Sequence, residues 1–135
     1  MGMANTATIM IWILSTVLAA FFVMSGSGKL MNSETAGGVN FDEQFVLWGY
    51  PAWFRIPVGL AEVAGAIGLM VPRLRFYAAA GLVFLMLGGT MTHLRVGEYA
   101  FAPIPFVLAI LAGTVAWMAK PVWLVSRFGR RGAPA

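Results

Sequence analysis

The apolar stretch IPVGLAEVAGAIGLMV, residues 56–71, contains a single carboxylate, Glu62. On a helix, Gly59 and Gly65 lie one turn to either side of it, and such small residues let a neighbouring backbone or a flat ligand approach closely. An ionised carboxylate in an apolar environment is costly, so we expect Glu62 to be either protonated or paired. Glu62 is a candidate catalytic or ligand-binding group that carries a proton or forms a hydrogen bond. It is equally a candidate clamp between two helices.

A second candidate group stands in GGTMTHLRVGE, residues 88–98, which holds the only histidine, His93. Thr90 shares its helical face. The helical rise places Glu62 level with about residue 85, so Thr90, or a water molecule, is predicted to be a nearer partner than His93. The imidazole is a candidate catalytic or cofactor-binding group, or a residue that caps the end of its helix.

Composition excludes several other chemistries. The 135 residues are 60% hydrophobic and only 10% charged, with no cysteine. Disulfides, thiolate metal sites and cysteine nucleophiles are therefore absent. One histidine and one buried acid are too few ligands for a metal, so we expect none. The net charge of +4 comes from basic residues that flank apolar runs, which does not indicate nucleic-acid binding.

Four apolar segments are close to the length of a transmembrane helix. Short connectors separate the last three and force antiparallel neighbours. The sequence therefore predicts one all-α domain over residues 1–135, an integral membrane antiparallel four-helix bundle in the lipid bilayer. The N-terminal segment lacks the features of a cleaved signal and is expected to remain as a span. The predicted spans cover residues 7–25, 53–71, 76–94 and 101–119, followed by a basic tail, 120–135.

The first connector is long and carries a helical pattern of its own. Phe41, Phe45 and Trp48 follow at i, i+4 and i+7, and Asn40 or Asp42 can cap a helix there. We predict a short helix that lies in the membrane interface or folds over the mouth of the bundle. A merely anchored loop is the alternative.

The distribution of basic residues predicts the orientation in the membrane. More basic residues lie on the side of the N-terminus than on the opposite side. We therefore expect a protein of the inner membrane with both termini in the cytoplasm. Those on the opposite side are expected to act as anchors that extend towards the membrane surface. The first group is Arg73, Arg75, Lys120, Arg127, Arg130 and Arg131, and the second is Lys29, Arg55 and Arg95.

Four stretches carry a resemblance to a known family: SGKLM, LWGYPAWFRIPVGLAEVAGAIGLMVPRLR, GGTMTHLRVGE and PIPFVLAIL. In this combination the chain resembles the DoxX-like proteins, small bacterial four-helix membrane proteins, over about residues 20–115. The resemblance implies a membrane subunit linked to quinones or to a redox complex. The family positions that match are Lys29, Gly49, Tyr50, Pro51, Glu62, Pro72, Arg73 and His93.

These observations lead to two hypotheses for the function. The first is a subunit of a quinone-dependent oxidoreductase, which is not an enzyme by itself and binds a quinone-like ligand. Its expected partners are further copies of itself or other membrane subunits. The second is a non-catalytic membrane scaffold within a larger complex. For the first hypothesis, the predicted ligand-binding residues are Glu62, Thr90, His93, Lys29, Gly59 and Gly65.

Overall fold

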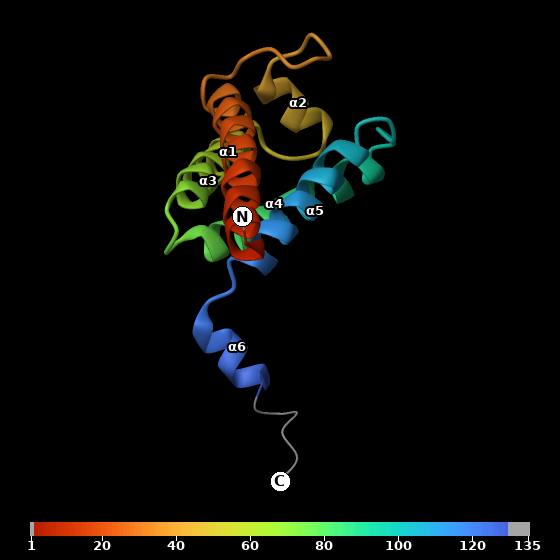
Figure 1. Cartoon of the computed structure of the whole chain (residues 1–135). Helices are drawn as coiled ribbons and strands as arrows, with labels where there is room; N and C mark the ends of the chain where they lie inside the picture. Colours follow the sequence, from red (N-terminus) through yellow and green to blue (C-terminus); the bar gives the residue numbers. More distant parts are fainter. Residues whose placement is uncertain (1, 130–135) are drawn as a thin grey trace.

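A computed structural model describes residues 2–129, and this part of the chain is all-helical, as predicted (Figure 1). The elements in chain order are α1 (Met3–Leu30), α2 (Phe41–Leu47), the 3₁₀ helix η1 (Ala52–Phe54), α3 (Arg55–Met70), α4 (Arg75–Arg95), α5 (Pro103–Met118) and α6 (Val122–Gly129).

Three helical segments are long and apolar enough to cross a membrane: α1, the continuous segment Ala52–Met70, and α4. Helix α5 is apolar but shorter, with 16 residues. Helix α1 has 28 residues and is about 42 Å long, so it extends well past the predicted span at both ends. The predicted basic tail is helical over α6, and residues 130–135 lie outside the described range.

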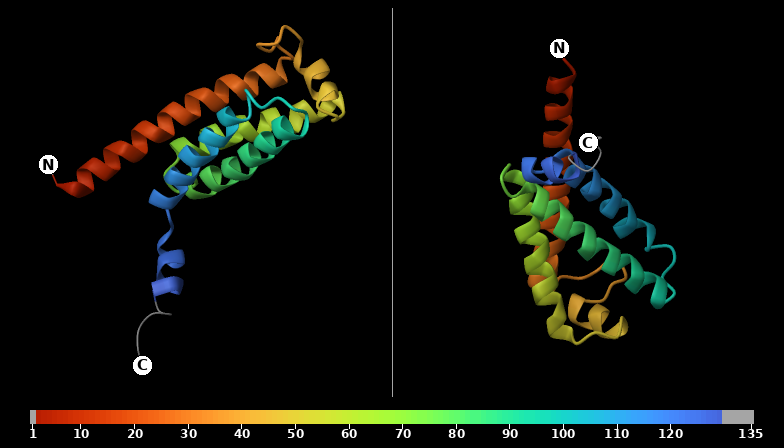
Figure 2. Two further views of the ribbon diagram at one scale, coloured as in Figure 1. Left: turned by 90° about the vertical axis from the view of Figure 1, so that its right-hand side faces the viewer. Right: turned by 90° about the horizontal axis from the view of Figure 1, so that it is seen from below.

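The long helices pack as two pairs, α1 with α3 and α4 with α5, and α4 also contacts α3. The pairs diverge towards the end where α2 lies, and α2 sits in the opening between them (Figure 2). We refer to this as the α2 end.

Glycines permit the closest helix contacts. A Cβ on Gly26 of α1 would lie 2.7 Å from the carbonyl oxygen of Gly59 in α3. A Cβ on Gly65 would lie 2.7 Å from the side chain of Leu82 in α4. A larger residue at position 26 would meet backbone, and one at position 65 would require the Leu82 side chain to shift. Gly59 and Gly65 were predicted to bind a ligand. In the structure, a neighbouring helix packs against each of them.

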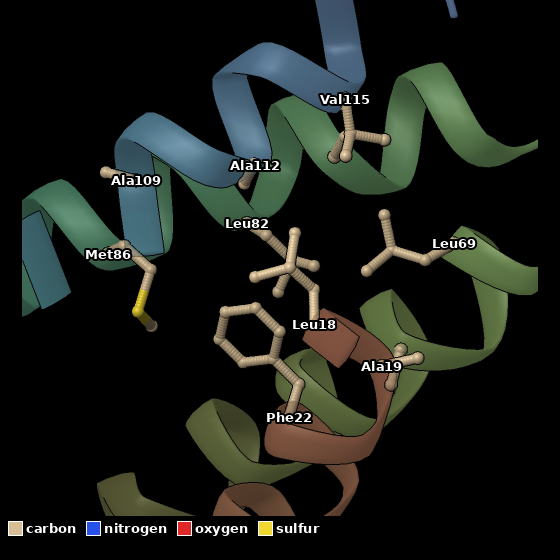
Figure 3. Close-up of a cluster of buried hydrophobic side chains, with 11 residues drawn as sticks. Leu18, Ala19, Phe22, Leu69, Leu82, Met86, Ala109, Ala112 and Val115 are labelled. Atoms are coloured by element: carbon tan, nitrogen blue, oxygen red, sulfur yellow. The ribbon is translucent and has the colours of Figure 1, made fainter. Parts of the chain in front are cut away.

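Away from the α2 end, the core is continuous. Leu18 and Phe22 from α1 meet Leu69 from α3, Leu82 from α4 and Val115 from α5, all at most 2% exposed (Figure 3). Close packing of these side chains fixes the four helices relative to one another in this half.

The short helix predicted in the first connector is present as α2. The side chain of Asn40 accepts a hydrogen bond from the backbone N–H of Glu43 and caps it, as the sequence suggests. Gly49, with a φ of 84°, ends α2, and the N–H of Tyr50 donates to the carbonyl of Phe45. This turn brings Tyr50 towards α4, where its hydroxyl meets Thr92.

We predict that Gly26→Ala destabilises the protein by about 1–3 kcal/mol, because the added methyl group meets a backbone oxygen that cannot move alone. Gly81→Ala is the matched control, since a Cβ there would have no neighbour within 4 Å. It should leave stability unchanged or raise it, because alanine favours the helix. Unfolding of both variants in mixed micelles measures the difference, and equal stabilities would refute the close contact.

Candidate functional site

A partly enclosed cavity of about 420 Å³ lies between the two helix pairs at the α2 end. Most of the side chains in its wall are apolar, and they include aromatic side chains from α1, α2 and α4. A cavity of this size, with a few polar groups in an apolar wall, is typical of a site for a small ligand. The polar side chains that line it are Ser25, Lys29, Trp48, Tyr50, Glu62, Thr92 and His93.

Glu62 is paired in this wall with Lys29 of α1. The ammonium donates to both carboxylate oxygens, at 3.1 and 3.0 Å, and to the hydroxyl of Ser25 at 2.8 Å. The side chains of Lys29 and Glu62 are only 11% and 3% exposed. The close contact of α1 with α3 allows the two groups to meet, and each charge compensates the desolvation of the other.

This pair confirms that Glu62 is held by a polar partner and corrects the identity of that partner. Lys29 was predicted to be an anchor at the membrane surface, and this is wrong because α1 continues to Leu30. Lys29 is therefore inside the last turn and buried. Thr90, predicted as the nearer partner of Glu62, donates instead to the carbonyl of Met86 in its own helix.

Arg55 joins the end of α1 to α2. Its guanidinium donates to the carbonyl oxygens of Lys29 and Leu30 and to the carboxylate of Asp42. Its side chain is 13% exposed, so the prediction of an anchor extended to the surface is wrong for Arg55 too. The bonds satisfy the free carbonyls at the C-terminus of α1, where a positive charge is favourable.

A second polar cluster lies across the cavity, where α4 ends. The Nδ1 atom of His93 is 2.7 Å from a carboxylate oxygen of Glu98, which also accepts a bond from the indole N–H of Trp48. Within the described residues, the other ring nitrogen of His93 has no hydrogen-bond partner. The carboxylate orients the imidazole and favours a proton on Nδ1, which leaves Nε2 for a ligand.

The hydroxyls of Tyr50 and Thr92, 2.9 Å apart, belong to the same side of the cavity. Arg95 lies over the ring of Tyr50, 5.0 Å from its centroid, and donates to the carbonyl of Trp48. Arg95 therefore binds the segment after α2 to α4. It thereby holds the cover of the cavity, which consists of α2 and residues 48–50, against α4. The side chain of Arg95 is exposed, as predicted.

The structure brings three of the six predicted ligand-binding residues to the cavity, namely Lys29, Glu62 and His93. Thr90 is outside its lining, as are Gly59 and Gly65. The cavity also contains polar residues that were not predicted as site residues, namely Ser25, Trp48, Tyr50 and Thr92. Ser25 lies one helical turn before Lys29, so the helical face that it shares with a predicted site residue was the available signal for it. In residues 2–129, no three histidine or acidic side chains are grouped as a metal site would require.

A comparison with models of protein families matches residues 13–115 to the DoxX-like family. The matched range covers most of the chain and includes every polar residue of the cavity. No curated protein and no solved structure matches the chain. Together with the three apolar helices that could span a bilayer, the match identifies an integral membrane protein.

We predict that Lys29→Met or Glu62→Leu alone destabilises the protein by about 3–5 kcal/mol, because each leaves one buried charge without its partner. The double variant should recover most of this loss, because no buried charge remains. Unfolding free energies of the three variants form a double-mutant cycle. If the losses of unfolding free energy of the two single variants add up in the double variant, Lys29 and Glu62 do not form a direct ion pair.

Proposed function

Because the chain belongs to the DoxX-like family, we propose that it is an inner-membrane subunit of a quinone-linked redox complex and binds a quinone-like ligand in its cavity. The observation that supports this proposal is the placement of polar groups on two opposite sides of an apolar, aromatic cavity. Other membrane subunits or further copies of the chain would be its partners.

A quinone ring is flat and apolar, with a carbonyl oxygen at each of two opposite edges. The cavity offers aromatic side chains for the ring and hydrogen-bond donors on each side. The group formed by Ser25, Lys29 and Glu62 comes from α1 and α3. The hydroxyls of Tyr50 and Thr92 come from the other side. In this arrangement Glu62 and Ser25 take the three N–H groups of the ammonium, and the Ser25 hydroxyl, which accepts from Lys29, can donate to one carbonyl oxygen of the ligand.

His93 supplies the group that exchanges protons. Conversion of a quinone to a quinol takes up two electrons and two protons, and the electrons would come from partner subunits. Since Nδ1 is held by Glu98, the Nε2 atom of a neutral imidazole can accept a proton from a quinol hydroxyl. The imidazolium can return this proton to the reduced ring, so His93 would carry one of the two protons and water would supply or take up the other. Through the contact at Nδ1, Glu98 holds the imidazole in one orientation for this exchange.

Within this proposal, α1, α3, α4 and α5 form a four-helix bundle across the membrane, with α2 in the outer interface and both termini in the cytoplasm. The apolar residues that flank α5 would complete its crossing. Among residues 2–129, four basic side chains belong to the end opposite α2, namely Arg73, Arg75, Lys120 and Arg127, against Lys29, Arg55 and Arg95 at the α2 end. This distribution is typical of a protein whose basic end faces the cytoplasm.

The proposed orientation predicts which positions react with a reagent that cannot cross the membrane. The chain has no cysteine, so Glu34→Cys and Ser126→Cys each introduce a single thiol. In spheroplasts, an impermeant maleimide should label position 34 directly and position 126 only after the membrane is disrupted. The reverse pattern would contradict cytoplasmic termini.

We predict that a tail-free benzoquinone binds the protein in lipid nanodiscs, and that the double variant Lys29→Met/Glu62→Leu weakens this binding about tenfold by removing one polar side of the cavity. Thr90→Val is the matched control, because this buried hydroxyl lies outside the cavity lining. It should change the affinity less than about twofold. Absence of quinone binding by the wild-type protein would refute the proposal and favour a non-catalytic scaffold.

A further inference from the structure

The wall of the cavity includes residues that are also exposed on the outer surface of the helices. Phe84 of α4 lines the cavity and is 76% exposed, and Gly88, one turn further along α4, also lines it and is exposed. Because the protein is an integral membrane protein, this surface faces lipid. The cavity therefore reaches the membrane-facing side of α4.

The position of this opening follows from how α3 and α4 pack. They are in contact in the halves away from α2, where Gly68 meets Ala78 and Gly65 meets the side chain of Leu82. Nearer the α2 end, the same side of α3 carries Val58, which lines the cavity instead. The two helices therefore separate where Val58 and Gly88 face the cavity, as the divergence of the helix pairs indicates (Figure 2).

The other routes to the cavity are more obstructed. At the α2 end, Trp48 is bonded to Glu98 in the connector after α4, and Tyr50 is bonded to Thr92 in α4, so this cover is held on both sides of Gly49. On the side of α5, the branched side chains of Ile104 and Leu108 form the wall. At Gly88 there is no side chain, and no atom lies within 4 Å of where a Cβ would be.

We propose that the gap between α3 and α4 is a lateral portal through which the ligand enters from the bilayer. The ligand class that fits is a quinone with a long apolar tail, whose ring occupies the cavity while the tail remains between Val58 and Gly88 and continues into lipid. This inference rests on the proposed function, because it specifies which quinones that site takes. An apolar surface that leads directly from lipid into the cavity favours a membrane-borne ligand over a water-soluble one.

The test compares Gly88→Phe with Gly81→Phe in full-length protein in nanodiscs of one lipid composition. Both glycines lie on the exposed side of α4, two turns apart, and neither has an atom within 4 Å of a Cβ position. Only Gly88 lines the cavity. Each variant is titrated with a long-tailed benzoquinone and with the tail-free ring, and a melting curve verifies that it is folded.

We expect Gly88→Phe to lower the affinity for the long-tailed quinone about tenfold or more, because the ring of the new side chain occupies the path of the tail. Its affinity for the tail-free ring should change less than about twofold, and Gly81→Phe should match the wild type with both ligands. Equal affinities of the two variants for the long-tailed quinone would overturn the portal alone. If neither quinone binds the wild type, the proposed function fails and the portal with it.

Discussion

The buried ion pair of Lys29 and Glu62 is the interaction on which the arrangement at the α2 end depends. Two charges in an apolar interior are tolerated only when they compensate each other, so α1 and α3 must approach closely and at one register. The contact of Gly26 with Gly59 permits that approach. The pair also places two charged groups in the wall of a cavity whose other surfaces are mostly apolar. Its polarity is therefore available to a ligand as well as to the helices.

The rest of the structure divides into a closed half and an open half. Core side chains such as Leu18 and Leu82 fill the space between the helices away from α2. At the other end the helix pairs separate, and α2 covers the opening without filling it. Polar connections hold this cover on both sides: Arg55 bonds to Asp42 on one side, and Trp48 bonds to Glu98 and Tyr50 to Thr92 on the other. The cover is thus fixed to both helix pairs, which gives the cavity a defined shape while its membrane-facing side stays accessible.

Much of this could be predicted from the sequence because apolar periodicity and caps are local signals. The helical character, the apolar segments, α2 with its Asn40 cap and the need of Glu62 for a partner all follow from neighbouring residues. The identity of that partner did not follow, because helical spacing gives the depth of a residue but not which helix faces it. The predicted first span ends at residue 25, whereas the helix continues to Leu30, which places Lys29 in the interior instead of at the rim.

The central claim is that the two polar sides of the cavity hold a quinone ring. Its most direct test is a crystal structure of the protein from crystals grown in a lipid mesophase with a benzoquinone present. The proposal predicts the ring in the cavity, with one carbonyl oxygen in hydrogen-bond distance of the Ser25 hydroxyl and the other near Tyr50 or His93. The pair of Lys29 and Glu62 should remain intact. A structure in which Lys29 extends to the surface, or in which the ring binds outside this cavity, would contradict it.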